Sequence, residues 1–223
     1  MQIIEQIIAT VAPHYCLGCD TEGTLLCAAC ASTLPPTPGQ CYRCGKLDEL
    51  GRTCVSCRRN SSLRSVQAVT TYEGTAKGLI ARLKFERAQA AAKDVAAAMA
   101  ARLTFKGGEQ FLVTYIPTAN TRVRRRGYDQ AQLIARELAR EFGTSRVALL
   151  ARVGNVRQLG AGREQRRAQL ANAFRPLKPY MVQNANVVLI DDVITTGSTL
   201  EAAAAILKAA GAKTVHAAVF ARA

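Results

Sequence analysis

Apolar and polar positions follow two different periods along the chain after residue 65. Short β-branched or apolar runs predict strands at 66–72, 111–116, 147–150, 187–190 and 214–221. Between them, apolar residues recur at helical spacing and predict helices at 75–85, 88–103, 128–142 and 200–210. Residues 117–127 show neither period and are expected to form a loop. Strands alternating with helices indicate an α/β fold, a doubly wound parallel sheet whose ligands lie beyond the carboxyl ends of the strands.

The amino-terminal end has a different character. Residues 3–11 place Ile and Val on one helical face, which predicts a short amphipathic helix that docks on the protein. This end lacks a basic leader and carries Glu5, so a signal peptide is not expected. No apolar run approaches the ~20 residues of a membrane span. We therefore expect a cytoplasmic protein without a transmembrane segment.

All eight cysteines lie in the first 57 residues, as four Cys-x-x-Cys pairs. The pairs are Cys16/Cys19, Cys27/Cys30, Cys41/Cys44 and Cys54/Cys57. A tight turn lets two such thiolates reach one ion at about 2.3 Å, and two pairs complete a tetrahedral zinc site. Disulfides would need an oxidising compartment, and a redox Cys-x-x-Cys normally occurs once. The pattern therefore predicts two structural Zn²⁺ sites.

Two ways of combining the pairs remain open. Consecutive pairs would give two zinc ribbons, 16–30 and 41–57, and this arrangement is favoured because the gaps are long enough for a hairpin. A cross-braced arrangement would join the first pair to the third and the second to the fourth. We expect residues 1–60 to form a small zinc-ribbon module with a short amino-terminal helix, and residues 61–223 to form the α/β domain.

Charge is distributed unevenly. The net charge is +14, and residues 122–178 hold fourteen Lys and Arg against four Asp and Glu. A local excess of this size attracts polyanions. Pyrophosphate and nucleic acid both fit, and they do not exclude each other.

The stretch 187–199, VVLIDDVITTGST, carries the most specific chemistry. Asp191 and Asp192 follow an apolar run, and a small, hydroxyl-rich loop then opens an Ala-rich helix. Loop N–H groups and the helix N-terminus can hold a phosphate, while the carboxylates can accept hydrogen bonds from vicinal hydroxyls or from waters on Mg²⁺. An ordinary βα turn is the alternative, but the acidic pair beside Thr-Thr-Gly-Ser-Thr disfavours it. The pattern predicts a site for a phosphorylated sugar.

A basic segment, 116–130, forms the second candidate half of the site. Guanidinium groups bind two phosphate oxygens at once, which suits a pyrophosphate. A solvated basic loop or a nucleic-acid patch is the alternative. We expect Arg122 to contact pyrophosphate and the other arginines of the segment to face solvent or nucleic acid.

Together these motifs resemble two known groups. The stretch 187–199 is similar to the 5-phosphoribosyl-1-pyrophosphate (PRPP) loop of type I phosphoribosyltransferases. With the cysteine pairs, Leu83-Lys84-Phe85, the Arg-x-Arg-Gly-Tyr-Asp-Gln signature at 124–130 and the Arg-rich stretch 157–174, the whole chain resembles the ComF family, which includes ComFC and GntX-like proteins. One departure is Thr118-Ala119-Asn120, where many relatives place a His.

The resemblance implies roles for individual residues. Asp191 and Asp192, the catalytic pair, would hold the ribose 2- and 3-hydroxyls, and Mg²⁺ would accompany PRPP. The 5-phosphate would lie on Thr195, Thr196, Gly197, Ser198 and Thr199. Arg122 and Lys84 would reach the pyrophosphate. Residues expected in a mobile lid or in nucleic-acid contacts are Arg124, Arg126, Arg157, Arg163, Arg166 and Arg167.

The resemblance also implies a function: a PRPP-binding, Mg²⁺-dependent phosphoribosyltransferase with an unknown nitrogen acceptor, linked to DNA uptake in natural competence. An alternative is a non-catalytic adaptor that binds single-stranded DNA and uses PRPP only as a sensed ligand. A third is a zinc-ribbon module that docks onto a competence helicase or processing protein.

Overall fold

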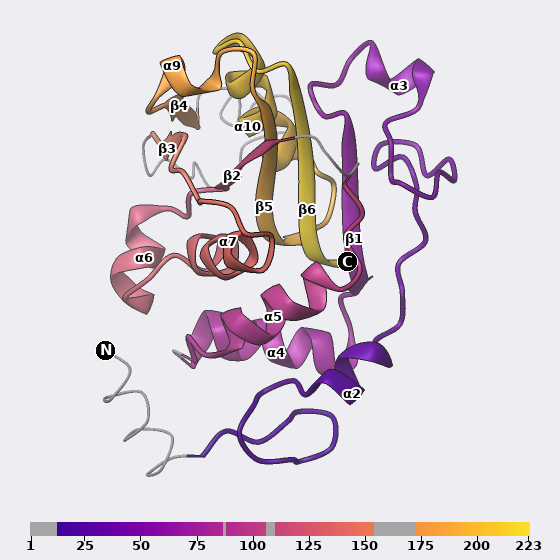
Figure 1. Cartoon of the computed structure of the whole chain (residues 1–223), viewed down its shortest axis with the longest axis vertical. Coiled ribbons are helices and arrows are strands. Elements are labelled where there is room, and N and C mark those ends of the chain that lie inside the picture. The colour runs from indigo at the N-terminus through magenta and orange to yellow at the C-terminus, as the bar shows by residue number, and fades with distance from the viewer. Residues whose placement is uncertain (1–12, 87, 106–109, 154–172) are drawn as a thin grey trace, which may run out of the picture.

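A four-stranded parallel sheet forms the centre of the computed structural model, which describes residues 13–86, 88–105, 110–153 and 173–223 (Figure 1). Its strands are β1 (Ser65–Thr71), β6 (Thr214–Arg222), β5 (Asn186–Ile194) and β2 (Phe111–Tyr115), in that spatial order. All three neighbouring pairs run parallel. The predicted α/β fold with a parallel sheet is confirmed.

Helices cover both faces of this sheet. On one face lie α4 (Gly74–Phe85), α5 (Ala91–Ala100) and α7 (Gln130–Glu141), which gather together in Figure 1. On the other face lies α10 (Ser198–Ala209), over a separate buried cluster. Alternate residues of β5 enter the two clusters, because successive strand side chains point to opposite faces. These four helices lie within or near the ranges that the apolar spacing predicts.

Strand β5 is longer than the sequence predicts. Its ladder continues beyond Ile190, since Asp191 pairs with Val219 and Val193 with Ala221 of β6. The prediction that the strand ends before the acidic pair is therefore wrong. Two β-branched residues after the pair, Val193 and Ile194, favour extended backbone and continue the strand.

The segment 117–127, expected to be a loop, contains a helix, α6 (Asn120–Arg126). Gly127 ends it in the left-handed conformation at φ 86°, and its N–H bonds to the carbonyl of Val123. The last turn carries three arginines, whose charges interact favourably with the carboxyl end of a helix dipole. Asp129 then caps α7 by accepting hydrogen bonds from the N–H groups of Ala131 and Gln132.

Smaller elements complete the α/β part. β3 (Leu150–Arg152) and β4 (Phe174–Pro176) pair antiparallel, so the strand predicted at 147–150 begins later, and α9 (Pro179–Val182) precedes β5. The predicted amino-terminal helix and most of the predicted lid, with Arg157, Arg163, Arg166 and Arg167, lie outside the described residues. Among the helices that are described, none combines the length and apolar character needed to cross a bilayer.

The cysteine-bearing segment wraps along the β1 side of the sheet, with short helices α2 (Ala28–Ser32) and α3 (Val55–Arg58) (Figure 1). Leu25 and Leu26 belong to the same buried cluster as α4 and α5. Asp94 of α5 accepts hydrogen bonds from both of their N–H groups, at 2.8 and 3.1 Å. Arg102 donates to four backbone carbonyls, those of Ala31, Ser32, Leu34 and Val69. The segment is thus attached to the sheet domain through apolar packing and hydrogen bonds.

Candidate functional site

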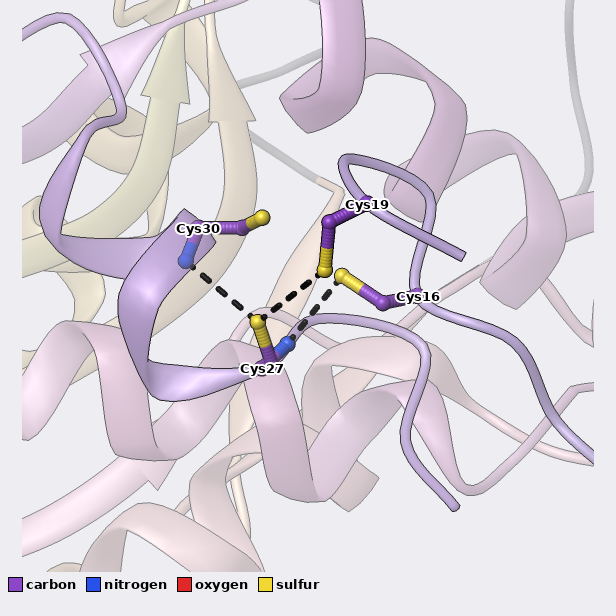
Figure 2. Close-up of side chains that lie close together, drawn as sticks. All are labelled: Cys16, Cys19, Cys27 and Cys30. Atoms are coloured by element: carbon purple, nitrogen blue, oxygen red, sulfur yellow. Dashed lines mark hydrogen bonds between the residues drawn. The ribbon is translucent and has the colours of Figure 1, made fainter. Parts of the chain in front are cut away.

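The eight cysteines form two clusters, each made of consecutive pairs. Within each cluster the four sulfur atoms lie within 4.8 Å of one another. The first cluster is Cys16, Cys19, Cys27 and Cys30, and the second is Cys41, Cys44, Cys54 and Cys57. Figure 2 shows the side chains of the first cluster converging on one point. The favoured consecutive arrangement is the one observed, in place of the cross-braced one.

Electrostatics within the first cluster favour a bound cation. Burial opposes ionisation of Cys16, but N–H groups of Cys27 and Gly18, at 3.4 and 3.5 Å from its sulfur, contribute to lowering its pKa to about 6. The neighbouring sulfurs of Cys19 and Cys27 raise the pKa of Cys30 to about 12. Four thiolates at this spacing repel one another unless a cation neutralises them, and four cysteine sulfurs are a common ligand set of structural zinc sites.

The cysteine pKa values of the second cluster are shifted in the same way. The Ser56 hydroxyl and then the N–H of Cys57 lower the pKa of Cys54 to about 6. The sulfurs of Cys54 and Cys44 raise the pKa of Cys57 to about 12. Since every ligand position is a thiolate, no coordination position remains for a substrate. Both clusters therefore fit structural Zn²⁺.

The acidic pair lies on β5 and is held by Lys84 of α4. Asp192 is 4% exposed, and its Oδ1 accepts a hydrogen bond from Lys84 Nζ at 2.9 Å. Among the described residues, Oδ2 of Asp192 has no hydrogen-bond partner. Asp191 Oδ1 accepts the N–H of Asp192 at 2.9 Å. Burial, followed by the charge of Asp192, raises the pKa of Asp191 well above its ordinary value. The pair thus contains one buried carboxylate oxygen that has no partner among the described residues.

Arg126 is the buried basic residue beside this pair. It is 8% exposed, its guanidinium carbon lies 5.6 Å from the ring centroid of Phe85, and Nη1 donates to Gln130 Oε1 at 2.6 Å. Its Nε finds no partner within the described part of the chain. Burial lowers the pKa of Arg126, while the nearby charge of Asp192 acts in the opposite direction.

The remaining arginines of α6 are more accessible to solvent than Arg126. Arg122, Arg124 and Arg125 are exposed, and the charge of Arg122 acts on Arg126, four residues along the helix. Residues four apart share a helix face, so Arg122 and Arg126 lie on the same side of α6. The expectation that Arg126 faces solvent or nucleic acid differs from its burial here, because the segment was expected to be a loop without helical faces.

The Tyr-Asp-Gln part of the motif at 124–130 fixes α6 and α7 to the rest of the site. Tyr128 Oη donates to the carbonyl of Leu83 at 2.5 Å, next to Lys84. Asp129 accepts hydrogen bonds from Thr118 N and Oγ1, at 2.6 and 3.1 Å. The ends of α4, β2 and α7 are thereby joined around the acidic pair.

The 195–199 loop joins β5 to α10 and includes the first two residues of that helix. Gly197 occupies the N-cap of α10 with φ 75°, a conformation that disfavours other residues. Thr195, Thr196 and Ser198 are exposed, and the hydroxyls of Thr196 and Ser198 lie 2.9 Å apart. The first N–H groups of a helix lack intrahelical partners and point toward such a loop. The geometry is suited to an anion.

One contact of this loop was missed by sequence reasoning. Tyr42 lies in the turn between Cys41 and Cys44 of the second cluster. Its hydroxyl donates a hydrogen bond to Glu201 in the first turn of α10. Its ring lies over Gly197, where an added Cβ would come 2.7 Å from Tyr42 Cδ2. Burial, and then the Glu201 carboxylate, raises the pKa of Tyr42, so the hydroxyl stays protonated. In the sequence, the aromatic residue inside a Cys-x-x-Cys turn was the feature that could have indicated this contact.

Comparison with known proteins identifies relatives over most of the chain. Residues 89–223 match the family model described as the phosphoribosyl transferase domain. Competence protein ComFC of Bacillus subtilis is 29% identical over 194 residues, covering 82% of this chain and 77% of that protein. DNA utilization protein YhgH of Salmonella typhi is 29% identical, covering 86% of this chain and 87% of that protein. Competence protein F of Haemophilus influenzae is 28% identical with the same coverage, 86% and 87%.

The matched region contains the acidic pair, the 195–199 loop, α6 and α7. The parallel sheet with helices on both faces agrees with this match, and the two cysteine clusters supply the amino-terminal module expected of the ComF family. This chain belongs to the phosphoribosyl transferase domain family, and the ComFC, YhgH and competence F proteins are its homologues.

Proposed function

We propose that this protein binds PRPP and transfers its phosphoribosyl group to a nitrogen acceptor. The observation that carries the proposal is the Lys84–Asp192 ion pair, at 2.9 Å, within the electrostatic reach of buried Arg126. A cation and a carboxylate with an unpaired oxygen match a ligand that carries both phosphates and hydroxyls. The 195–199 loop, directly after the strand that bears the carboxylates, supplies a place for a terminal phosphate.

Each part of the site would take one part of PRPP. Asp191 and Asp192 would accept hydrogen bonds from the ribose hydroxyls, and Thr195 to Thr199 would hold the 5-phosphate. Lys84 and Arg122 would contact the pyrophosphate. The carboxylates of Asp191 and Asp192 would offer oxygen acceptors, of the type that Mg²⁺ and its waters prefer, to an Mg²⁺ ion that accompanies PRPP. Bound Mg²⁺ would neutralise charge on the pyrophosphate oxygens.

In the proposed reaction the acceptor nitrogen bonds to C1 of the ribose as the bond from C1 to the pyrophosphate oxygen breaks. The electron pair leaves with pyrophosphate, and the nitrogen loses its proton to solvent. Lys84 and Arg122 stabilise the charge that develops on the leaving group. The carboxylates and the loop fix the sugar between acceptor and leaving group, so catalysis depends on positioning.

A role in DNA uptake, in the cytoplasm, forms the second part of the proposal. The relatives named competence protein or DNA utilization protein support it. The exposed arginines of α6, Arg124 and Arg125, would offer phosphate contacts to single-stranded DNA beside the PRPP site. In the alternative, adaptor function, the protein binds DNA and PRPP without releasing pyrophosphate. Measured pyrophosphate release separates the two functions.

The test measures PRPP affinity by calorimetry with Mg²⁺ present, and pyrophosphate release with candidate nitrogen acceptors. The double variant Asp191→Asn/Asp192→Asn is expected to bind PRPP at least about tenfold more weakly, which corresponds to ~1.4 kcal/mol. Glu137→Gln is the matched control, because that carboxylate pairs only with Arg136 and Arg140 among the ion pairs of the described residues. Equal PRPP affinity in wild type and the double variant would refute the proposal.

A further inference from the structure

Tyr42, which stands between two cysteines of the second cluster, contacts the candidate phosphate loop, whereas the first cluster lies beside α4 and α5. We infer that Tyr42 is a positioning residue that couples metal loading of the second cluster to the shape of the 195–199 loop. The identification of the loop's ligand as PRPP rests on the function proposed above. The coupling itself rests on the contacts of Tyr42, Gly197 and Glu201.

The ring of Tyr42 fits against the tightest point of the loop. Gly197 is buried, and a Cβ placed on it would lie 2.7 and 3.0 Å from Cδ2 and Cε2 of Tyr42. Such separations are too short for carbon atoms, whose favourable contacts begin near ~3.5 Å. Tyr42 therefore packs against the main chain of Gly197 itself. Displacement of the ring would remove the surface on which this left-handed turn lies.

Glu201 provides a second connection between the cluster and the loop. Its carboxylate accepts hydrogen bonds from the hydroxyl of Tyr42, from Ser61 Oγ at 2.9 Å and from Ser62 N at 2.6 Å. Its own N–H donates to the carbonyl of Gly197 at 2.9 Å. Of these three donors to the carboxylate, Tyr42 lies within the second cluster, and Ser61 and Ser62 follow its last cysteine. The first turn of α10 is therefore held by the metal-binding segment.

Bound metal would determine where the Tyr42 ring lies. Tyr42 stands between Cys41, which is fully buried, and Cys44. The turn is closed by hydrogen bonds from Cys41 N to Lys46 O and from Gly45 N to Cys41 O, at 2.8 and 2.9 Å. A cation on the four sulfurs fixes both cysteines and hence the residue between them. Without it the four sulfurs are no longer tied to one point, so the turn between Cys41 and Cys44 can move and carry the ring away from Gly197.

The test uses hydrogen exchange of the amides at 195–201, together with affinities for PRPP and for pyrophosphate, on the full zinc-loaded chain. Tyr42→Ala is expected to speed exchange of these amides and to weaken PRPP binding about tenfold, ~1.4 kcal/mol. Pyrophosphate lacks the 5-phosphate, so its affinity should stay unchanged. Tyr42→Phe keeps the ring and should restore most of the PRPP affinity. General unfolding would change both affinities, so this split distinguishes positioning from a structural defect.

Two further variants control the experiment. Tyr15→Ala removes a half-exposed tyrosine beside Cys16 of the first cluster and should leave the 195–201 amides unchanged. Glu201→Gln perturbs the contact from the α10 side, away from the cysteines, and should speed exchange while both zinc ions remain bound. Removal of zinc by a chelator should speed exchange as Tyr42→Ala does. Unchanged exchange in zinc-loaded Tyr42→Ala and Glu201→Gln, or unchanged exchange in wild type after zinc removal, would overturn the inference. If exchange of the 195–201 amides speeds up in these variants and on zinc removal, but wild type does not bind PRPP, the proposed function is refuted and the coupling stands.

Discussion

Lys84 and Asp192 join two segments that are 108 residues apart, with Nζ of one 2.9 Å from Oδ1 of the other. Lys84 lies near the end of α4 and Asp192 on β5, and their side chains are 20% and 6% exposed. A charge pair this shielded from water leaves a costly unpaired carboxylate when the cation is removed. The pair thus connects the packing of α4 on the sheet with the chemistry of the site.

Lys84→Met should lower the free energy of unfolding by about 1–3 kcal/mol, since the lysine is partly solvated and the loss falls below that of a fully buried pair. Arg82→Met on the same helix is the matched control. It breaks a pair with Glu86 whose side chains are 46% and 53% exposed. Exposed pairs contribute about 0–1 kcal/mol. Urea denaturation measures the free energy of unfolding of both variants. Equal decreases would show that the buried pair stabilises the protein no more than the exposed one.

Arg126→Ala should destabilise the protein by about 2 kcal/mol, because it removes a buried side chain packed on Phe85 and bonded to Gln130. Its neighbour Arg125 is exposed, and Arg125→Ala should change stability by less than about 0.5 kcal/mol. Thermal or urea unfolding checks both values. A larger loss for Arg125→Ala than for Arg126→Ala would show that α6 presents the opposite face to the site.

Gly197→Ala should lower the free energy of unfolding by more than its left-handed backbone conformation alone explains. The backbone term is about 1–2 kcal/mol for a residue with a side chain. The contact with Tyr42 adds to it, since the new Cβ would lie 2.7 Å from the ring. Gly143→Ala isolates the backbone term, because Gly143 has φ 62° and nothing within 4 Å of an added Cβ. If both substitutions cost the same in urea unfolding, Tyr42 does not pack on the loop as described.

Stability should depend on pH through Asp191. Its pKa is raised, first by burial, so the folded protein keeps a proton that the unfolded chain releases near its ordinary pKa of about 3.9. The stabilising contribution is complete below that value and is lost as pH rises through the folded pKa. Asp191→Asn should therefore become more stable relative to wild type as pH rises above about 3.9. Urea unfolding midpoints measure the difference between the two proteins. A difference that stays constant as pH rises would contradict the raised pKa of Asp191.

Zinc content should follow the two clusters. The wild-type chain is expected to carry two equivalents, one for each group of four cysteines. Cys19→Ser and Cys44→Ser should each remove about one equivalent, because each variant leaves three thiolates in one cluster. Mass spectrometry of the metal checks this. Full zinc content in both variants would show that these sulfurs are not ligands.

Local patterns in the sequence predicted most of the fold. The Cys-x-x-Cys spacing gave the ligand groups, and apolar periodicity gave α4, α5, α7, α10 and all four sheet strands. The end of β5 was missed, because polar Asp191 and Asp192 interrupt the apolar pattern that marks a buried strand. The ladder with β6 holds the strand beyond the point where its side chains become polar.

Contacts between distant segments could not be predicted. Helix α6 has no apolar period, since arginines fill its last turn, so the inward position of Arg126 depends on packing against α4. The contact of Tyr42 with Gly197 joins residues more than 150 positions apart. Neither residue indicates the other by local spacing. Both depend on how the cysteine-bearing segment and the sheet domain pack together.

A crystal structure with PRPP and Mg²⁺ bound tests the central claim most directly. We expect the 5-phosphate within hydrogen-bond distance, about 3 Å, of the N–H groups and hydroxyls at 197–199. The ribose hydroxyls should lie on Asp191 and Asp192, and the pyrophosphate should point toward Lys84 and α6. PRPP bound away from β5, or with its 5-phosphate outside the 195–199 loop, would contradict the account.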